Sequence, residues 1–375
     1  MKIIKWIILF LILCNMPSYM LAYFGSGLGS ITSYASSLLL LVYFFFARPR
    51  HKLLLPFILL GILYFTISGI HFSYPDEKLI INEFLRFMIL VVCAVEVIHR
   101  TNKKELFIVL FIGALSIIIN ALIFPEANAN FYPTYGRYSG FYLNPNTAGI
   151  TCLIGYVFTY GINDRRLKLA GQIVFTLAGI FTFSRTFIII WLLITLIAIY
   201  NNRKNLLVPV IGALILILVF VFSGRLTLNT ERFDAITSIF ESKGANSDAL
   251  TEDSRTETWA IYSDMIMDKP ILGHGYLKLS NKQYGPGVHN SYLMILGESG
   301  FIPFLLFLGI YTYIVSKSIR LTKTNPEYLY ISIVIVLALL ASHTYFTEFF
   351  KVFISMFLFV EIRKLQPTLN IEKTE

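Results

Sequence analysis

The chain has 375 residues, of which 56% are hydrophobic and 14% are charged, and its formal net charge is +9. A typical soluble domain has about 45–50% apolar and about 25% charged residues, so this composition excludes an ordinary soluble protein. The three cysteines all fall in apolar runs and lack the spacing of a disulfide framework or a metal site, which excludes a cysteine-stabilised fold.

Apolar runs recur along almost the whole length and lack the two-residue alternation of a membrane β-strand. Each run is long enough to cross roughly 30 Å of hydrocarbon as a helix, or nearly so. We therefore predict an all-α polytopic protein that forms one membrane domain over residues 1–375. Its twelve predicted transmembrane helices cover approximately residues 4–24, 31–47, 53–70, 79–98, 105–124, 146–162, 169–183, 187–200, 206–223, 301–316, 328–344 and 347–362.

The connections between these helices alternate in charge. Five of them are basic, with 3, 3, 3, 2 and 3 Lys or Arg in segments 48–52, 99–104, 163–168, 201–205 and 317–323, and the short connections between them hold at most one. Because an excess of Lys and Arg marks cytoplasmic loops, both termini are predicted to lie inside the cell. The same alternation puts one large polar loop, residues 224–300, outside, between helices 9 and 10. The positive charge therefore belongs to the cytoplasmic loops, and nucleic acid is excluded as a partner.

The apolar stretch 169–200 contains a single charge, Arg185, near its middle. If the stretch were one helix, the basic connections 163–168 and 201–205 would lie on opposite sides of the membrane, against the charge rule. We therefore predict a hairpin of two helices of about 15 residues, or ~23 Å, with Arg185 at its outer tip. An ionisable group at this place is a candidate functional residue. The alternatives are an arginine that snorkels to the headgroups or pairs with a carboxylate such as Glu83.

The outer loop contains a strong helix signal in the sequence SRTETWAIYSDMIMDKPILGHG. Ser254 and Glu257 form a capping box at its start. Arg255 falls in the first turn, where a cation opposes the helix dipole at a cost of about 0.3–1 kcal/mol. An anion bound at this helix start would explain the arginine. A solvated surface arginine is the alternative.

A second short helix is predicted in HNSYLMILGESG, with Asn290 or Ser291 as its cap and Gly300 at its end, lying in the outer membrane interface. His289 stands immediately before the cap. An imidazole titrates near neutral pH, which makes His289 a candidate general base, although a loop histidine often has no such role. Arg137 lies among tyrosines in the 125–145 segment, an environment that suits phosphate and sugar surfaces and also the aromatic belt of any membrane protein.

Four sequence blocks together resemble the O-antigen ligase and O-antigen polymerase superfamily, and the resemblance covers residues 135–315. The blocks occur in family order, with the large outer loop among them: RYSGFYLNPNTAG, FTFSRT, SRTETWAIYSDMIMDKPILGHG and HNSYLMILGESG. The last block matches a family signature at His289, Asn290 and Gly300, whereas Pro303 replaces its second glycine. No D-x-D, P-loop, HExxH or G-x-S-x-G motif occurs in the chain.

The resemblance implies a metal-independent, inverting glycosyltransferase of the GT-C type in the bacterial cytoplasmic membrane, without a cofactor. Its substrate would be an undecaprenyl-pyrophosphate-linked glycan on the outer leaflet, and its acceptor a second glycan or a lipid. Arg185 and Arg255, with Arg137 as a third contact, would bind the pyrophosphate. His289 would deprotonate the acceptor hydroxyl, and residues 224–300 would form an extracytoplasmic catalytic loop.

Three functions remain open besides the favoured O-antigen, capsule or exopolysaccharide polymerase. A ligase would move the finished glycan to another acceptor. A transporter or flippase of lipid-linked glycans fits the composition and the helix number, but such proteins usually have two similar halves with midplane polar groups, and no such repeat is evident. The third alternative is a non-catalytic scaffold among polysaccharide-assembly partners.

Overall fold

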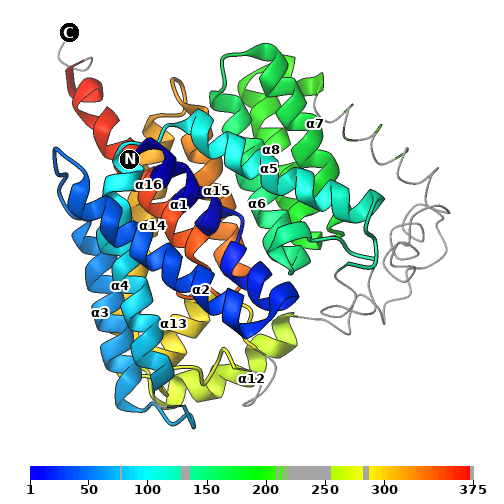
Figure 1. The fold of residues 1–375 in the computed structure, drawn as a ribbon. Helices are drawn as coiled ribbons and strands as arrows, with labels where there is room; N and C mark the ends of the chain where they lie inside the picture. The colour runs from blue at the N-terminus through cyan, green and yellow to red at the C-terminus, as the bar shows by residue number, and fades with distance from the viewer. Residues whose placement is uncertain are drawn as a thin grey trace. The chain divides into compact units, whose positions relative to one another are not determined.

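A computed structural model describes residues 1–76, 78–127, 136–207, 255–281 and 287–371, together with positions 210, 212, 214 and 217. The described residues form α-helices and short 3-10 helices, and no strand occurs among them (Figure 1). The all-helical class predicted from the sequence is therefore confirmed for these residues. The chain divides into two compact units. Unit 1 comprises Met1–Ile12, Ser30–Asn102 and Arg255–Glu375, and unit 2 comprises Leu13–Gly29 and Lys103–Ser254.

The first two helices are α1 (Lys2–Leu13) and α2 (Met16–Phe46). The predicted end of the first helix at residue 24 is confirmed by a break at Gly25, whose φ of 86° is not helical. The prediction is wrong in running unbroken from residue 4 to 24, because the chain also turns at Asn15, with φ 52°. Asparagine adopts this left-handed conformation at little cost, so a single residue ends one helix before the next begins.

Seven of the later helices lie wholly in unit 1. They are α3 (Leu55–Ile70), α4 (Lys78–His99), α12 (Arg255–Asp268), α13 (Ser291–Ser299), α14 (Phe301–Arg320), α15 (Pro326–Leu340) and α16 (Phe349–Ile371). Helix α16 packs against α4 and α15, and α3 packs against α4, α13 and α14. Aromatic rings fill the centre of this unit: Tyr64 stacks on Phe346 with ring centroids 3.8 Å apart, and Phe87 and Tyr276 contact the same pair.

Unit 2 contains α5 (Lys103–Leu122), α6 (Pro145–Phe158), α7 (Arg165–Phe181) and α8 (Arg185–Asn201). Helices α5, α6 and α7 pack pairwise, and α8 packs against α6 and α7. Glycines allow these close approaches. A Cβ on Gly179 of α7 would lie 2.0 Å from the Phe187 ring, and a Cβ on Gly155 of α6 would lie 2.2 Å from the Phe175 ring.

The predicted division of the 169–200 stretch into two helices is confirmed. Helix α7 ends at Phe181 and α8 begins at Arg185, with Thr182–Ser184 between them. Each helix has 17 residues, or about 26 Å, slightly longer than predicted. Helix α8 begins at this point because the Ser184 hydroxyl accepts a hydrogen bond from the Phe187 N–H, a standard N-cap.

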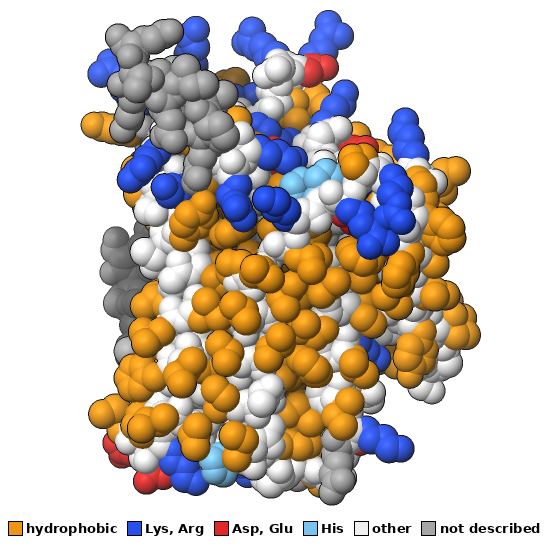
Figure 2. Space-filling model, turned by 90° about the vertical axis from the view of Figure 1, so that its left-hand side faces the viewer, with side chains coloured by type: hydrophobic (Ala, Val, Ile, Leu, Met, Phe, Trp, Pro, Cys, Tyr) orange, Lys and Arg blue, Asp and Glu red, His pale blue; other side chains and the backbone are white. Residues whose placement is uncertain are grey.

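Three helices of the described chain are long and apolar enough to cross a membrane: Met16–Phe46, Lys103–Leu122 and Phe301–Arg320. Leu55–Ile70, Arg185–Asn201 and Pro326–Leu340 are shorter apolar helices. Figure 2 shows a broad hydrophobic band across one face, with many Lys and Arg side chains gathered at one edge of it, as the charge rule leads one to expect. A multi-pass membrane protein is supported, whereas the number of twelve spans and the orientation of the termini remain predictions.

The C-terminal pair of helices differs from the prediction. Helix α15 ends at Leu340 and α16 begins at Phe349, so the connection covers residues 341–348 rather than the two residues predicted. Helix α16 then continues to Ile371, beyond the predicted end at residue 362. The predicted helix 206–223 falls mostly outside the described residues. The longer connection matters because it contains His343.

Candidate functional site

Three of the sequence blocks form helix starts with the same backbone arrangement. In each, a residue with positive φ precedes a side chain that caps the helix: Leu143 (60°) before Asn144 of α6, Phe183 (47°) before Ser184 of α8, and His289 (46°) before Asn290 of α13. Positive φ is uncommon for such residues and costs about 1–3 kcal/mol, and it concentrates at functional sites. Three of the blocks identified in the sequence therefore share one backbone feature, a residue with positive φ followed by an N-cap.

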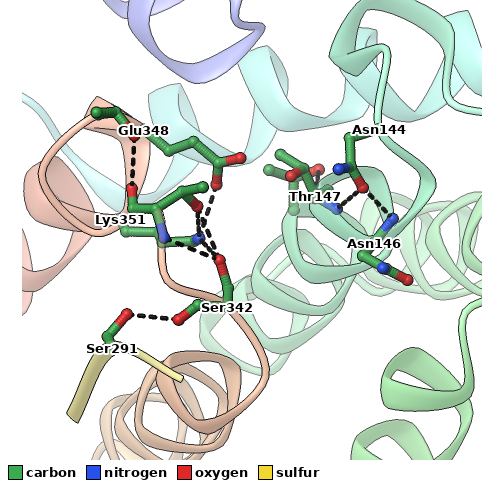
Figure 3. Close-up of polar contacts among 10 residues, drawn as sticks. Asn144, Asn146, Thr147, Ser291, Ser342, Glu348 and Lys351 are labelled. Carbon is green, nitrogen blue, oxygen red and sulfur yellow. Dashed lines mark hydrogen bonds and ion pairs between the residues drawn. The ribbon is translucent and has the colours of Figure 1, made fainter. Parts of the chain in front are cut away.

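The N-cap of α6 illustrates this local chemistry (Figure 3). The Asn144 side-chain oxygen accepts hydrogen bonds from the N–H groups of Asn146 and Thr147, at 2.8 and 3.3 Å. Pro145 occupies the first helical position, where its missing N–H is no loss. The sequence Asn144-Pro145-Asn146 therefore forms the cap and first turn of α6.

Arg137 and Arg185 both lie in unit 2, close to the starts of α6 and α8. The Arg137 guanidinium donates to the Thr182 carbonyl at 2.9 Å and to the Asn146 side-chain oxygen at 3.0 Å. The Ser184 hydroxyl donates to the same Asn146 oxygen at 3.2 Å. Arg137 therefore ties the segment before α8 to the start of α6, which gives it a structural role beside the predicted one.

Arg185 is the first residue of α8 and is exposed. Arg255 occupies the same position in α12, whose first residue it is. A cation at the start of a helix opposes the helix dipole and adds to the positive potential of the free N–H groups there. Two of the predicted arginines thus stand where an anion is best accommodated. The capping box predicted for Ser254 and Glu257 lies outside the residues whose side chains are described.

His289 and α12 lie near each other in unit 1. The Trp259 indole of α12 donates to the carbonyl of Val288, the residue before His289, at 3.0 Å. Tyr262 and Ile266 of α12 are buried, at 4% and 5% exposed. This packing brings the helix that begins at Arg255 onto the segment that carries His289.

His289 lies directly on the connection between α15 and α16. Its backbone N–H donates to Nδ1 of His343 at 3.1 Å, and the two imidazole rings have centroids 4.8 Å apart. The Ser291 hydroxyl donates to the Ser342 carbonyl at 2.6 Å, so two hydrogen bonds hold the start of α13 on residues 342–343. The His289 side chain itself is exposed.

His343 is held as a neutral imidazole. Its Nδ1 accepts the His289 N–H, and it also bonds to the backbone of Ser280. Burial lowers the pKa of His343 to about 4, and the charges of His289 and Lys351 act in the same direction. Because Nδ1 must stay unprotonated to accept, the low pKa and the hydrogen-bond geometry agree on one protonation state.

A buried lysine donates hydrogen bonds to this connection (Figure 3). Lys351 of α16 is 2% exposed, and its ammonium group donates to the Ser342 and Thr344 hydroxyls at 2.6 and 2.7 Å. It also pairs with Glu348, with Nζ and Oε2 2.7 Å apart. A buried ammonium group with these partners fixes the residues on both sides of His343.

A model of the O-antigen ligase family matches residues 170–308. This chain carries an O-antigen ligase family domain. The matched region begins within α7 and ends within α14, so it contains Arg185, Arg255 and His289, whereas Arg137 precedes it. A search of curated proteins found no match.

Sequence reasoning missed His343 and Lys351 beside the O-antigen ligase family domain. They follow the family match and lie 54 and 62 positions after His289, so no local pattern joins them to it. The available signal was an ionisable lysine within an apolar run, which marks a functional candidate. Among the described residues, no group of three or more His, Cys, Asp or Glu is arranged to hold a metal ion.

Proposed function

We propose that this protein is a glycosyltransferase that polymerises undecaprenyl-pyrophosphate-linked oligosaccharide repeats in O-antigen, capsule or exopolysaccharide synthesis. In the proposed step an acceptor hydroxyl oxygen bonds to C1 of the donor sugar with inversion. The bond from C1 to the pyrophosphate oxygen breaks, and undecaprenyl pyrophosphate leaves with the electron pair. His289 takes the proton of the hydroxyl.

The arrangement at His289 is the observation that carries this proposal. The side chain is exposed, lies inside the family match, and is held by its own backbone on the neutral imidazole of His343. A general base must be accessible, oriented and unprotonated at working pH. Because the neighbouring imidazole of His343 is neutral, it places no positive charge beside His289. Proton transfer by such a base contributes typically about 10²–10⁴-fold to the rate.

Arg185 and Arg255 are proposed to bind the pyrophosphate, with Arg137 as a third contact. This assignment comes from the family resemblance and from the chemistry of guanidinium, which neutralises a leaving pyrophosphate without a metal. Each charge-assisted hydrogen bond contributes about 1.5–3 kcal/mol. The position of the first two arginines at helix starts supports the proposal, because N–H groups and dipole favour the same anion there.

The proposed setting is the bacterial cytoplasmic membrane with the active site outside. Residues 135–315 would form the ligase- and polymerase-like core, and residues 224–300 the catalytic loop. The regular alternation of basic and non-basic connections supports this orientation. The acceptor would be a glycan carried on a second lipid, and polysaccharide-assembly proteins are proposed as partners.

A ligase is the second candidate, favoured by the description of the matched family as O-antigen ligase. Deletion of the gene separates the two. Loss of a polymerase leaves single-repeat products, whereas loss of a ligase leaves long chains on the carrier lipid. An unchanged glycan profile would contradict both.

Reconstitution of the purified protein with defined lipid-linked oligosaccharide tests catalysis directly. We expect longer lipid-linked glycans from the native protein and a loss of about 100-fold or more in His289→Asn. Asparagine is the matched substitution because it tolerates the left-handed backbone at this position better than alanine does. Movement of the substrate across the membrane without a new glycosidic bond would identify a transporter instead.

A further inference from the structure

Unit 1 contains a cavity of about 170 Å³ beside His343. Three aromatic side chains line it, Tyr64, Tyr276 and Phe346, and three hydroxyl side chains, Ser280, Thr344 and Thr347. None of the described residues that line it is Arg, Lys, Asp or Glu. One of the lining residues, Thr347, is exposed, so the cavity reaches the surface at this residue.

The size of the cavity selects one ring. A cavity of roughly 150 Å³ holds benzene, a six-membered ring. Sites for drug-sized ligands measure about 300–1,000 Å³, so an oligosaccharide or a lipid pyrophosphate is too large for this one. A single pyranose ring presents apolar C–H faces to aromatic walls and hydroxyl groups to polar ones.

The hydrogen bonds behind the wall determine its polarity. Glu298 of α13 is fully buried, and both cavity hydroxyls nearest to it donate to its carboxylate: Tyr64 to Oε2 at 2.5 Å and Ser280 to Oε1 at 2.8 Å. The N–H groups of Leu279 and Ser280 donate to the same Oε1, each at 3.1 Å. The protons of the two hydroxyls are therefore committed to Glu298, and their oxygens are left to act as acceptors.

His343 adds to the same pattern. Its Nδ1 is occupied by the His289 N–H, and it bonds to the Ser280 backbone, so it offers the cavity no cation. Behind Tyr64 and Ser280 lies the Glu298 carboxylate, and behind Thr344 lies the Lys351 ammonium, which donates to the Thr344 hydroxyl at 2.7 Å. The two buried charges are opposite, so the wall favours a neutral ligand that donates O–H groups to Tyr64 and Ser280. At those two oxygens a phosphate would meet acceptors and a carboxylate.

We propose that this cavity binds one uncharged sugar ring, which, resting on the proposed function, is the ring of the acceptor glycan. The ring lies against the aromatic side chains and donates hydroxyl protons to Tyr64 and Ser280. Its place beside His343 puts it next to the residue that holds His289. The pyrophosphate of the donor does not enter this cavity.

A cysteine reporter tests the proposal independently of catalysis. The full-length protein with Thr347→Cys is labelled with a thiol reagent, and the three native cysteines stay silent because all are buried. Thr347 is exposed and lies outside the helices, so the variant keeps the fold. Ser263→Cys, on the exposed face of α12 and outside the cavity, is the matched control.

The probes are glucose, galactose, mannose and N-acetylglucosamine, each at high concentration, with inorganic pyrophosphate and benzene as comparisons. At least one hexose is expected to slow labelling of Thr347→Cys about two-fold or more, the factor reached when the site is half occupied, without slowing that of Ser263→Cys. The hexose that protects best identifies the ring.

The proposal is overturned if no hexose protects, if pyrophosphate protects as well as a hexose does, or if benzene alone protects. Slowing of the control to the same extent would also overturn it, since the effect would then not be local. These failures leave the proposed glycosyltransferase intact as long as His289→Asn abolishes transfer. Conversely, protection in a protein without transferase activity would retain the sugar site and remove the proposed function.

Discussion

Replacement of Lys351 by methionine is expected to destabilise the protein strongly. The ammonium group is buried and donates to the Ser342 and Thr344 hydroxyls, and it pairs with Glu348 at 2.7 Å. Methionine retains most of the apolar stem but has no donor. The variant therefore keeps the packing and removes all of the polar contacts at once.

The magnitude follows from burial. Breaking a buried ion pair by removing one partner costs about 3–5 kcal/mol, because the other charge remains without its counterion. The Glu348 side chain is 21% exposed, so some solvent reaches it and the lower end of this range applies. We expect a loss of about 3 kcal/mol in the free energy of unfolding. Transfer activity also falls, since residues 342–344 support His289.

The control lies on the same helix. Lys364 pairs with Glu361 at the same 2.7 Å and the same three-residue spacing, but its side chain is 42% exposed. Surface ion pairs contribute about 0–1 kcal/mol, so Lys364→Met is expected to change stability by less than about 1 kcal/mol. Unfolding of both variants is measured in the same detergent.

A double substitution completes the test. Glu348→Gln removes the negative charge that Lys351 neutralises, so Lys351→Met combined with Glu348→Gln is expected to cost less than the sum of the single changes, by about 0.5–3 kcal/mol. Equal losses for Lys351→Met and Lys364→Met, or strict additivity in the double variant, would refute the assignment of a buried, coupled pair.

Three further predictions concern pH, packing and the arginines. His343 has a pKa of about 4 against an ordinary 6.5, so the unfolded state binds a proton across this window that the folded state does not. Stability is therefore expected to fall as pH falls from 6.5 to 4, by up to ~3 kcal/mol, and His343→Asn flattens this dependence of the unfolding midpoint. Gly179→Ala puts a Cβ 2.0 Å from a phenylalanine ring and should cost about 1–3 kcal/mol, whereas Gly309→Ala meets nothing within 4 Å and should be neutral or slightly stabilising in the same measurement. Arg137→Met loses two hydrogen bonds and should lower both stability and transfer. Arg185 is exposed, so Arg185→Met should lower transfer about 10- to 150-fold and change the unfolding midpoint less than Arg137→Met does.

Local rules predicted the parts of the fold that depend on near neighbours. The break before Arg185 followed from the charge rule applied to loops on either side. Helix-end chemistry predicted the Gly300 end of α13 and a cap at Asn290 or Ser291, of which the structure has Asn290. Gly300 has a φ of 77°, and a Cβ there would lie 1.9 Å from the Ile271 carbonyl oxygen. The helix end predicted at Gly300 therefore requires a glycine, because any side chain would collide with the Ile271 carbonyl.

The charge rule and helix-end chemistry could not predict contacts between residues far apart in the sequence. The turn at Asn15 was missed because one left-handed asparagine inside an apolar run changes no hydropathy pattern. The contact of His289 with His343 joins residues 54 positions apart, and the bond from Tyr64 to Glu298 joins residues 234 positions apart. Only tertiary packing selects such partners, so the neutral imidazole and the acceptor-lined cavity could be found only in the structure.

The most direct test of the account is formation of a glycosidic bond by the purified protein from one defined undecaprenyl-pyrophosphate-linked repeat. We expect lipid-linked products of two or more repeats, release of one undecaprenyl pyrophosphate for each glycosidic bond formed, and loss of both in His289→Asn with an unchanged unfolding midpoint. Undiminished product from the folded His289→Asn variant would show that His289 is not the general base.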